Sequence, residues 1–173
     1  MGALRPWVEN PGALRAPGTY ILVAHLTEAH SIRVGRWGEF LFSRGYYLYV
    51  GSALGGLEGR LSRHLRAAKR PHWHIDALLE WASVSEVWYI LLRERLECAW
   101  ARALTGMEGL APFEVPFGAS DCRCPTHLFY TPTAPCLAAF RSALPYGEAI
   151  CALTAQQAAL LFSRGEEPPQ NAR

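Results

Sequence analysis

The strongest restriction on the fold comes from residues 47–65, YLYVGSALGGLEGRLSRHL, where the sequence pattern changes from that of a strand to that of a helix. The first part is rich in aromatic and β-branched residues, which favours a β-strand. Beyond a glycine-rich segment, Leu57, Leu61 and Leu65 recur every fourth residue, which is the spacing of one helix face. A strand must therefore pass through a glycine-rich turn directly into a helix, expected from about residue 57 to residue 68.

Three consecutive extended stretches predict an antiparallel sheet. Residues 18–28, GTYILVAHLTE, alternate in the manner of a strand, with Tyr20 and Leu22 on one face and Ile21 on the other. Residues 31–42, SIRVGRWGEFLF, and 45–50, GYYLYV, are the next extended stretches. Because they follow one another closely, they imply a meander.

Downstream segments predict helices around this sheet. Pro71 is expected to start a second helix, residues 84–92 form a strand, and residues 94–104 form a third helix. A short strand, THLFY, precedes a Pro-rich connector and an Ala-rich helix near residues 154–162. The predicted fold class is α/β (α+β): a small antiparallel sheet, with a three-stranded core meander plus added strands, flanked by helices.

The chain of 173 residues has the length of one domain. We divide it into an N-terminal extension (1–17), a main domain (18–130), a C-terminal helical extension of that domain (131–163) and a disordered tail (164–173). The longest apolar run, 87–92, is too short to cross a membrane, and the N-terminus lacks an apolar signal core. Five cysteines without an export signal argue against a secreted disulfide framework. The expected location is the cytoplasm.

The glycine-rich turn does not match the common phosphate-binding motifs. A P-loop needs Lys after its last glycine, where this chain has Leu57, and the glycines do not take the GxGxxG spacing. Ser52 is not in a GxSxG elbow, because Val50 occupies the first glycine position. The remaining interpretation is a close backbone approach beside a helix N-terminus, which suits an anion.

Basic residues gather after this turn although the net charge is only +2. Residues 60–70, RLSRHLRAAKR, hold five Arg or Lys and no acid. Arg60 and His64 lie side by side at helical spacing, which favours a phosphate, although a solvated helix face has the same pattern. The predicted nucleic-acid contacts are Gly51, Ser52, Arg63, Arg66, Lys69 and Arg70.

Three other residues are candidates for the same site. Tyr20 and Tyr49 come from strands that can be neighbours, so their phenols can point into one cleft; packing within the sheet is the alternative. Glu97 is a single carboxylate in apolar surroundings, or simply an acid favoured at the start of a helix.

The ordered set of these residues resembles a known family. Gly18-Thr19-Tyr20, Tyr49-Val50-Gly51, Arg60 with His64, and Glu97 within LECAWARAL are similar in order to the motifs of the GIY-YIG nuclease superfamily. The segments YVGSALGGLEGRLSRHL, HWHIDALL and FGASDCRCPTHLFY more closely resemble an uncharacterised branch, found alone or fused to endonuclease III-type repair enzymes. The resemblance covers residues 18–130, which it identifies as a GIY-YIG-like domain.

The resemblance implies a metal-dependent endonuclease that hydrolyses phosphodiester bonds in DNA, associated with DNA repair and repair proteins. It implies that Glu97 holds a single Mg²⁺ or Mn²⁺ ion and that Tyr20 acts as general base or positions the water. Arg60 would stabilise charge on the phosphate, while Tyr49 and His64 would orient the water or relay protons.

Two departures from the pattern motivate a second hypothesis. In most members a tight hairpin joins the two triplets, whereas residues 21–48 intervene here. Many members also carry an asparagine beyond the glutamate, but this chain has only Asn10 and Asn171. The alternative function is a nucleic-acid-binding module that keeps the fold without turnover.

Two groups of potential metal ligands have several interpretations. Cys122, Cys124 and His127 supply three ligands, and Cys98 or Cys136 could complete a Zn²⁺ site. A hydrolase with a cysteine nucleophile beside His127 is another interpretation, and a tightly packed loop with buried thiols and an Asp121 cap is preferred. A second group, His72, His74 and Asp76, is expected to serve in capping or phosphate contacts rather than as metal ligands.

Overall fold

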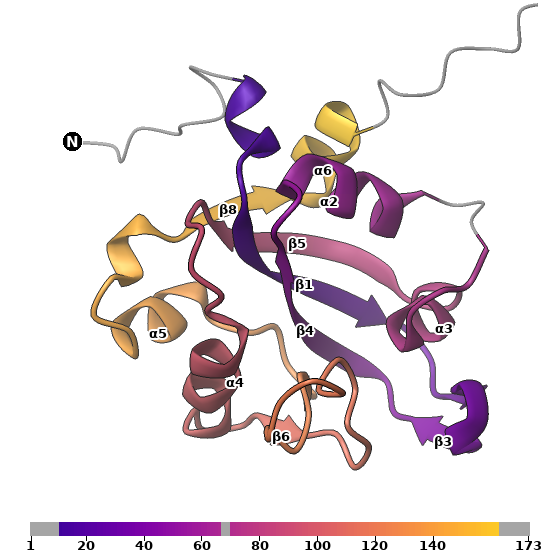
Figure 1. Cartoon of the computed structure of the whole chain (residues 1–173). Coiled ribbons are helices and arrows are strands. Elements are labelled where there is room, and N and C mark those ends of the chain that lie inside the picture. Colours follow the sequence, from indigo (N-terminus) through magenta and orange to yellow (C-terminus); the bar gives the residue numbers. More distant parts are fainter. Residues whose placement is uncertain (1–10, 67–69, 163–173) are drawn as a thin grey trace, which may run out of the picture.

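A six-stranded antiparallel sheet forms the centre of the computed structural model, which describes residues 11–66 and 70–162 (Figure 1). Its strand order is β6-β7-β4-β1-β5-β8. The central strand β1 pairs with β4 on one side and with β5 on the other. The strands are β1 (Gly18–Leu26), β4 (Gly45–Ala53), β5 (Ser83–Ile90), β6 (Ala111–Pro112), β7 (Leu128–Thr131) and β8 (Cys151–Thr154).

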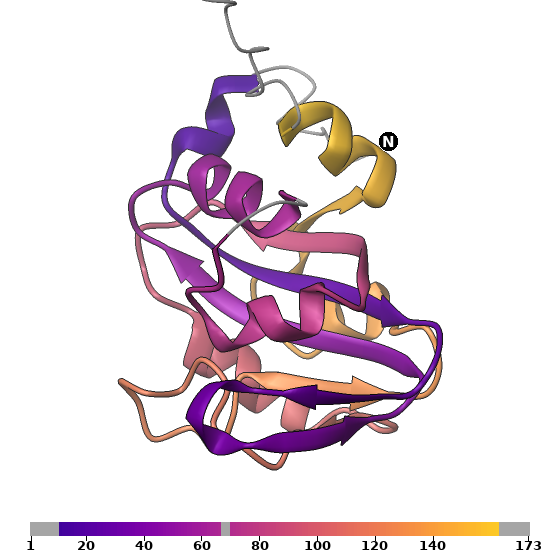
Figure 2. The same cartoon turned by 90° about the vertical axis from the view of Figure 1, so that its right-hand side faces the viewer.

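Helices cover both faces of the sheet (Figures 1 and 2). On one face, Tyr20 and Leu22 pack in a core with residues of α2, α3 and α6, whereas Ile21 and Val23 pack on the other face with residues of α4 and α5. The two faces predicted for β1 are therefore confirmed, as is the mixed α/β class. The helices are α2 (Leu57–Leu65), α3 (His74–Leu79), α4 (Glu97–Thr105), α5 (Leu137–Ser142) and α6 (Ala155–Phe162), with 3-10 turns at Pro11–Arg15, Gly35–Trp37 and Gly147–Ala149.

The predicted meander is wrong in its middle strand. Residues 31–42 do not enter the main sheet; they form a separate hairpin of β2 (His30–Arg33) and β3 (Glu39–Phe42), visible in Figure 2 as the indigo and purple arrows beside the main sheet. Gly35 and Gly38 adopt positive φ angles of 47° and 105°, which turn the chain back on itself within this stretch. β4 can therefore pair directly with β1.

Several predicted boundaries also differ. β4 continues to Ala53 because its last residues pair with the start of β1. The second helix begins at His74 rather than at Pro71, because Trp73 is extended and its N–H binds the Asp76 carboxylate. The helix predicted to reach residue 68 ends at Leu65. Strand β8 and helix α5 lie between THLFY and the Ala-rich helix, where the sequence predicts a Pro-rich connector.

Some predictions fall outside the described residues: most of the N-terminal extension (1–10), Lys69 and the tail at 164–173. Within residues 11–66 and 70–162, the helices are all too short or too polar to span a bilayer.

Candidate functional site

A buried phenol–imidazole pair joins β1 to α2. The Tyr20 hydroxyl and His64 Nε2 are 2.8 Å apart and share a hydrogen bond. Tyr20 has no exposed surface and His64 is 3% exposed. Gly51 lies opposite Tyr20 in the sheet, and a Cβ there would be 2.5 Å from the Tyr20 hydroxyl. The glycine thus leaves the space in which the phenol reaches the histidine.

Tyr49 lies on the same side, with its ring centre 6.1 Å from that of His64. Burial raises the pKa of Tyr49 to about 12, and the nearby Arg60 charge opposes this rise. Burial likewise raises the pKa of Tyr20 well above 10, with Tyr49 adding to the rise and Arg60 opposing it. Both phenols are therefore neutral near pH 7, which suits positioning of a water better than removal of its proton.

Trp73 contacts two arginines of α2 through its ring. The guanidinium carbons of Arg60 and Arg63 lie 4.5 and 4.3 Å from the centre of its ring system. Arg63 also forms a 3.2 Å ion pair with the buried Asp76, so its charge is already balanced. Sequence reasoning missed Trp73, although its place in HWHID just before a helix was a usable signal.

Glu97 lies at the start of α4, with both carboxylate oxygens engaged. Ser52 Oγ donates a hydrogen bond to Oε2, and Arg95 lies 2.9 Å from Oε1. Arg95 is also 4.0 Å from Asp121, so one guanidinium lies between two carboxylates. The field of Glu97 reaches both phenols, where it raises their pKa values. Four elements thus bring the predicted catalytic residues into electrostatic contact.

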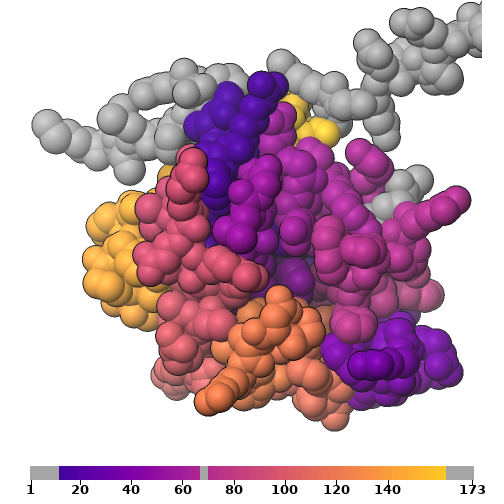
Figure 3. Space-filling view, viewed as in Figure 1, coloured from indigo at the N-terminus to yellow at the C-terminus, as the bar shows by residue number. Residues whose placement is uncertain are grey.

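Two of the predicted site residues line different cavities. Glu97 lines a cavity of about 230 Å³, whose other lining residues are Arg95, Cys98, Gly118, Asp121, Cys122 and His127. His64 lines a different cavity of about 420 Å³, between α2, α3 and α6. The two phenols are buried, with Tyr20 at 0% and Tyr49 at 8% exposure. Figure 3 shows the surface where the loop before β7 (orange) lies between the α4 and α3 segments.

The predicted nucleic-acid contacts have different environments. Gly51 and Ser52 belong to β4 rather than to a turn, and Ser52 binds Glu97. The first N–H of α2, from Leu57, donates to the Ala16 carbonyl at 3.1 Å, so the chain itself uses part of the expected anion site. Arg66 and Arg70 are exposed.

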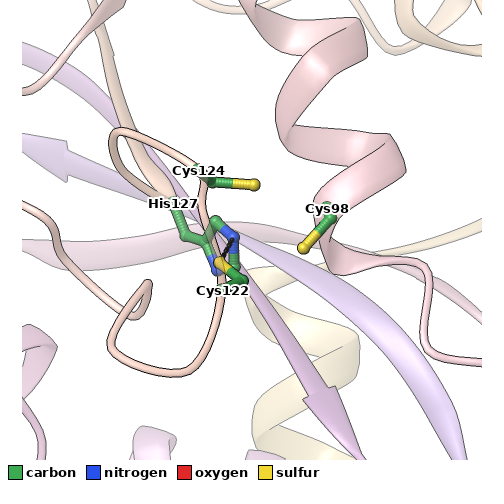
Figure 4. Close-up of side chains that lie close together, drawn as sticks. All are labelled: Cys98, Cys122, Cys124 and His127. Carbon is green, nitrogen blue, oxygen red and sulfur yellow. Dashed lines mark hydrogen bonds between the residues drawn. The ribbon is translucent and has the colours of Figure 1, made fainter.

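A second cluster contains only sulfur and nitrogen donors. Cys98 of α4 meets Cys122, Cys124 and His127 of the loop, with the four donor atoms within 4.8 Å of one another (Figure 4). Of the two cysteines considered as a fourth ligand, Cys98 is the one that is close. The cluster could hold a metal ion. Its three thiols are half-buried rather than fully buried, and the side chain of Asp121 is 75% exposed.

The HWHID group serves as a cap, as predicted. Asp76 Oδ2 accepts hydrogen bonds from the backbone N–H groups of His72 and Trp73 at 2.8 and 3.0 Å. His74 instead packs against Trp37, with ring centres 3.8 Å apart and the ring planes tilted by 32°. These three predicted candidates therefore do not share a ligand site.

Comparison with protein families gives one match, described as "Domain of unknown function DUF123" and covering residues 19–145. The matched segment runs from β1 through α5, so it contains every element that contributes to the two clusters. No curated protein and no solved structure matches the chain significantly.

Proposed function

The chain belongs to the DUF123 family, a domain of unknown function, and we propose that it is a metal-dependent endonuclease of the GIY-YIG type acting on DNA. The observation that carries the proposal is the convergence of two phenols, one arginine, one histidine and one carboxylate from four elements. Tyr20 bonds His64, and both Tyr20 and Tyr49 lie within the fields of Arg60 and Glu97. This combination suits phosphodiester hydrolysis, with repair of DNA as the expected setting.

The residues around Glu97 fit a hard divalent cation. Its carboxylate is 12% exposed, borders a cavity, and has the Ser52 hydroxyl as a neighbouring oxygen donor. The guanidinium of Arg95, a side chain that is 55% exposed, already lies against this carboxylate, which indicates that positive charge is favoured there. Bound Mg²⁺ or Mn²⁺ would supply Lewis-acid activation of the phosphate. Thiols are poor ligands for these ions, so the cysteine cluster does not fit that role.

The other residues have roles that follow from their contacts. Arg60, oriented by Trp73, would hold a phosphate oxygen and stabilise the charge that develops there. Tyr20 remains a neutral phenol and would orient a water, while His64 would share its proton through their hydrogen bond. The exposed Arg66 and Arg70 extend the basic surface along which DNA would lie.

The decisive experiment incubates supercoiled, branched and single-stranded DNA with the protein and Mg²⁺ or Mn²⁺. We expect cleavage that EDTA abolishes, and a loss of at least about 100-fold in rate for Arg60→Ala and Glu97→Gln. Glu94→Gln, at an exposed acid in the same segment, is the control and should cleave normally. Cleavage that survives Glu97→Gln would contradict the assigned metal ligand.

The second candidate function is a nucleic-acid-binding module without turnover. It is favoured by the two existing contacts of the Glu97 carboxylate and by the complete burial of Tyr20. Fluorescence anisotropy with labelled DNA separates the two functions. Binding that persists in both metals, without cleavage of any of the three substrates, would leave only this second function.

A further inference from the structure

The cysteine cluster has no role in the proposed hydrolysis, yet its donors are gathered at one point. Three thiol sulfurs and one imidazole nitrogen face one another between α4 and the loop that leads into β7 (Figure 4). All five cysteines of the chain are free thiols, so no disulfide explains the gathering. We infer that Cys98, Cys122, Cys124 and His127 form a structural Zn²⁺ site that fastens this loop to the start of α4.

The one donor–donor distance that can be compared directly agrees with a tetrahedral site. Zinc bonds of about 2.3 Å to sulfur and about 2.0 Å to nitrogen place two such donors roughly 3.5 Å apart. Cys122 Sγ and His127 Nε2 are 3.5 Å apart. Four protein ligands would fill the coordination sphere, which distinguishes structural from catalytic zinc. Thiolates also select Zn²⁺ over Mg²⁺ and Mn²⁺, so the two proposed sites differ in their metal.

The histidine is held in place before any metal binds. His127 is 2% exposed, its N–H donates to the Phe117 carbonyl at 2.8 Å, and its carbonyl accepts the Val50 N–H at 2.9 Å. With the backbone of His127 fixed in this way, its ring Nε2 faces the Cys122 thiol. The zinc would therefore join a fixed histidine to a cysteine of another element, while the thiol protons pass to solvent.

The site would also stiffen its surroundings. Cys98 directly follows Glu97, so a bond to Cys98 would restrain the helix start that carries the carboxylate. On the loop, the position of a Cβ on Gly118 is 3.1 Å from the Tyr49 ring, so the loop packs closely against that phenol. Only this positional consequence rests on the proposed function; zinc binding does not.

A cysteine nucleophile paired with His127 is the rival interpretation. It accounts for the contact between Cys122 and His127, but it gives no reason for two further thiols at the same point. Alkylation distinguishes the two, because a metal-bound thiolate is shielded until the metal is removed.

The test measures metal in protein that has been purified without an affinity metal. We expect one Zn²⁺ per chain by mass spectrometry of the digested protein, and Co²⁺ substitution should give the intense visible bands of a tetrahedral thiolate site. Removing the metal should lower the thermal midpoint by roughly 10 °C, and Zn²⁺ but not Mg²⁺ should restore it. None of these readouts requires nuclease activity.

Variants locate the site. Cys98→Ser and Cys124→Ser should each lose bound Zn²⁺, whereas Cys136→Ser, at an exposed cysteine outside the cluster, should keep it. Hydrogen exchange at the start of α4 should speed up in the first two variants and stay unchanged in the third. A folded wild-type protein that takes up neither Zn²⁺ nor Co²⁺, or zinc retained by both cluster variants, would overturn the inference.

Discussion

At the scale of single residues, the candidate site depends on the absence of a side chain at Gly51 as well as on its polar groups. Tyr20 reaches His64 only because the opposing residue, Gly51, has no side chain. The polar groups around them are similarly shared: Ser52 links Glu97 to Thr19, whose hydroxyl is 3.2 Å away. A change at one of these positions is therefore expected to act through its neighbours.

Gly51→Ala tests the space that Tyr20 occupies. The new methyl group would lie 2.5 Å from the Tyr20 hydroxyl and would displace the phenol from His64. We expect a loss of about 1–3 kcal/mol in the free energy of unfolding, measured in urea, and weaker DNA cleavage. Gly55→Ala is the control, because a Cβ there meets no atom within 4 Å. Equal stabilities for the two variants would show that the phenol can move at little cost.

The pKa of Tyr49 gives a pH-dependent prediction. Below pH 10 the phenol is neutral in both the folded and unfolded states, so it contributes no pH dependence. Between pH 10 and about 12 it ionises only in the unfolded chain, and stability is lost as the pH rises. Urea unfolding at pH 9 to 11 should show a fall steeper in wild type than in Tyr49→Phe, by up to about 1.4 kcal/mol per pH unit. Parallel curves would contradict the raised pKa.

At the scale of elements, the sequence predicts the helices and strands that are long enough to show a regular spacing of hydrophobic residues. Strand β1 and helices α2 and α4 follow from their alternating or four-residue spacing, because burial of one stripe or face sets that period. Strand β8 and helix α5 have four and six residues, too few for a period to be recognised. The spacing of hydrophobic residues also does not indicate which strands pair with each other. The sequence therefore predicts residues 31–42 as a strand of the main sheet, whereas they form the β2–β3 hairpin.

For the candidate site, the sequence indicates the residues of separate motifs better than the contacts between them. The order of the motifs selected Tyr20, Arg60 and Glu97, which the fold brings into electrostatic contact. Trp73 was missed because its role depends on a turn that places it over two arginines. The sequence alone does not distinguish Cys98 from Cys136 as a fourth ligand, because the choice depends on how α4 packs against the loop. Contacts between elements distant in sequence leave no local pattern.

The β2–β3 hairpin belongs to the core although it lies outside the main sheet. Phe42 is fully buried and stacks on Phe113 with ring centres 4.6 Å apart, whereas the adjacent Leu41 is 69% exposed. We expect Phe42→Ala to lower the free energy of unfolding by about 3–5 kcal/mol and Leu41→Ala by less than about 0.5 kcal/mol. Chemical denaturation of the two variants measures both values. Similar small losses would mean that the hairpin is an appendage.

At the scale of the whole molecule, one sheet supports two hydrophobic cores on its opposite faces. Strand β8 and helix α6 lie beyond the segment matched by the family model, yet Leu153 and Ala158 are buried in the core of the first face. We therefore expect these last elements to unfold together with the rest.

Calorimetry of two leucine variants tests this cooperativity. Leu153→Ala removes a fully buried side chain and should lower the free energy of unfolding by about 2–5 kcal/mol, within a single transition. Leu160→Ala, at a residue 66% exposed on α6, should leave the transition nearly unchanged. A separate early transition in the Leu153→Ala scan would instead indicate an independent C-terminal unit.

The central position of β1 has a consequence for synthesis on the ribosome. Gly45, which pairs with Leu26, is synthesised soon after it, whereas Ile90, which pairs with Thr19, is synthesised much later. At about 5–20 residues per second, roughly 4 to 14 s pass between the translation of these two residues. During that interval one hydrogen-bonding edge of the nascent central strand is open, so this is the stage at which chaperones would matter most.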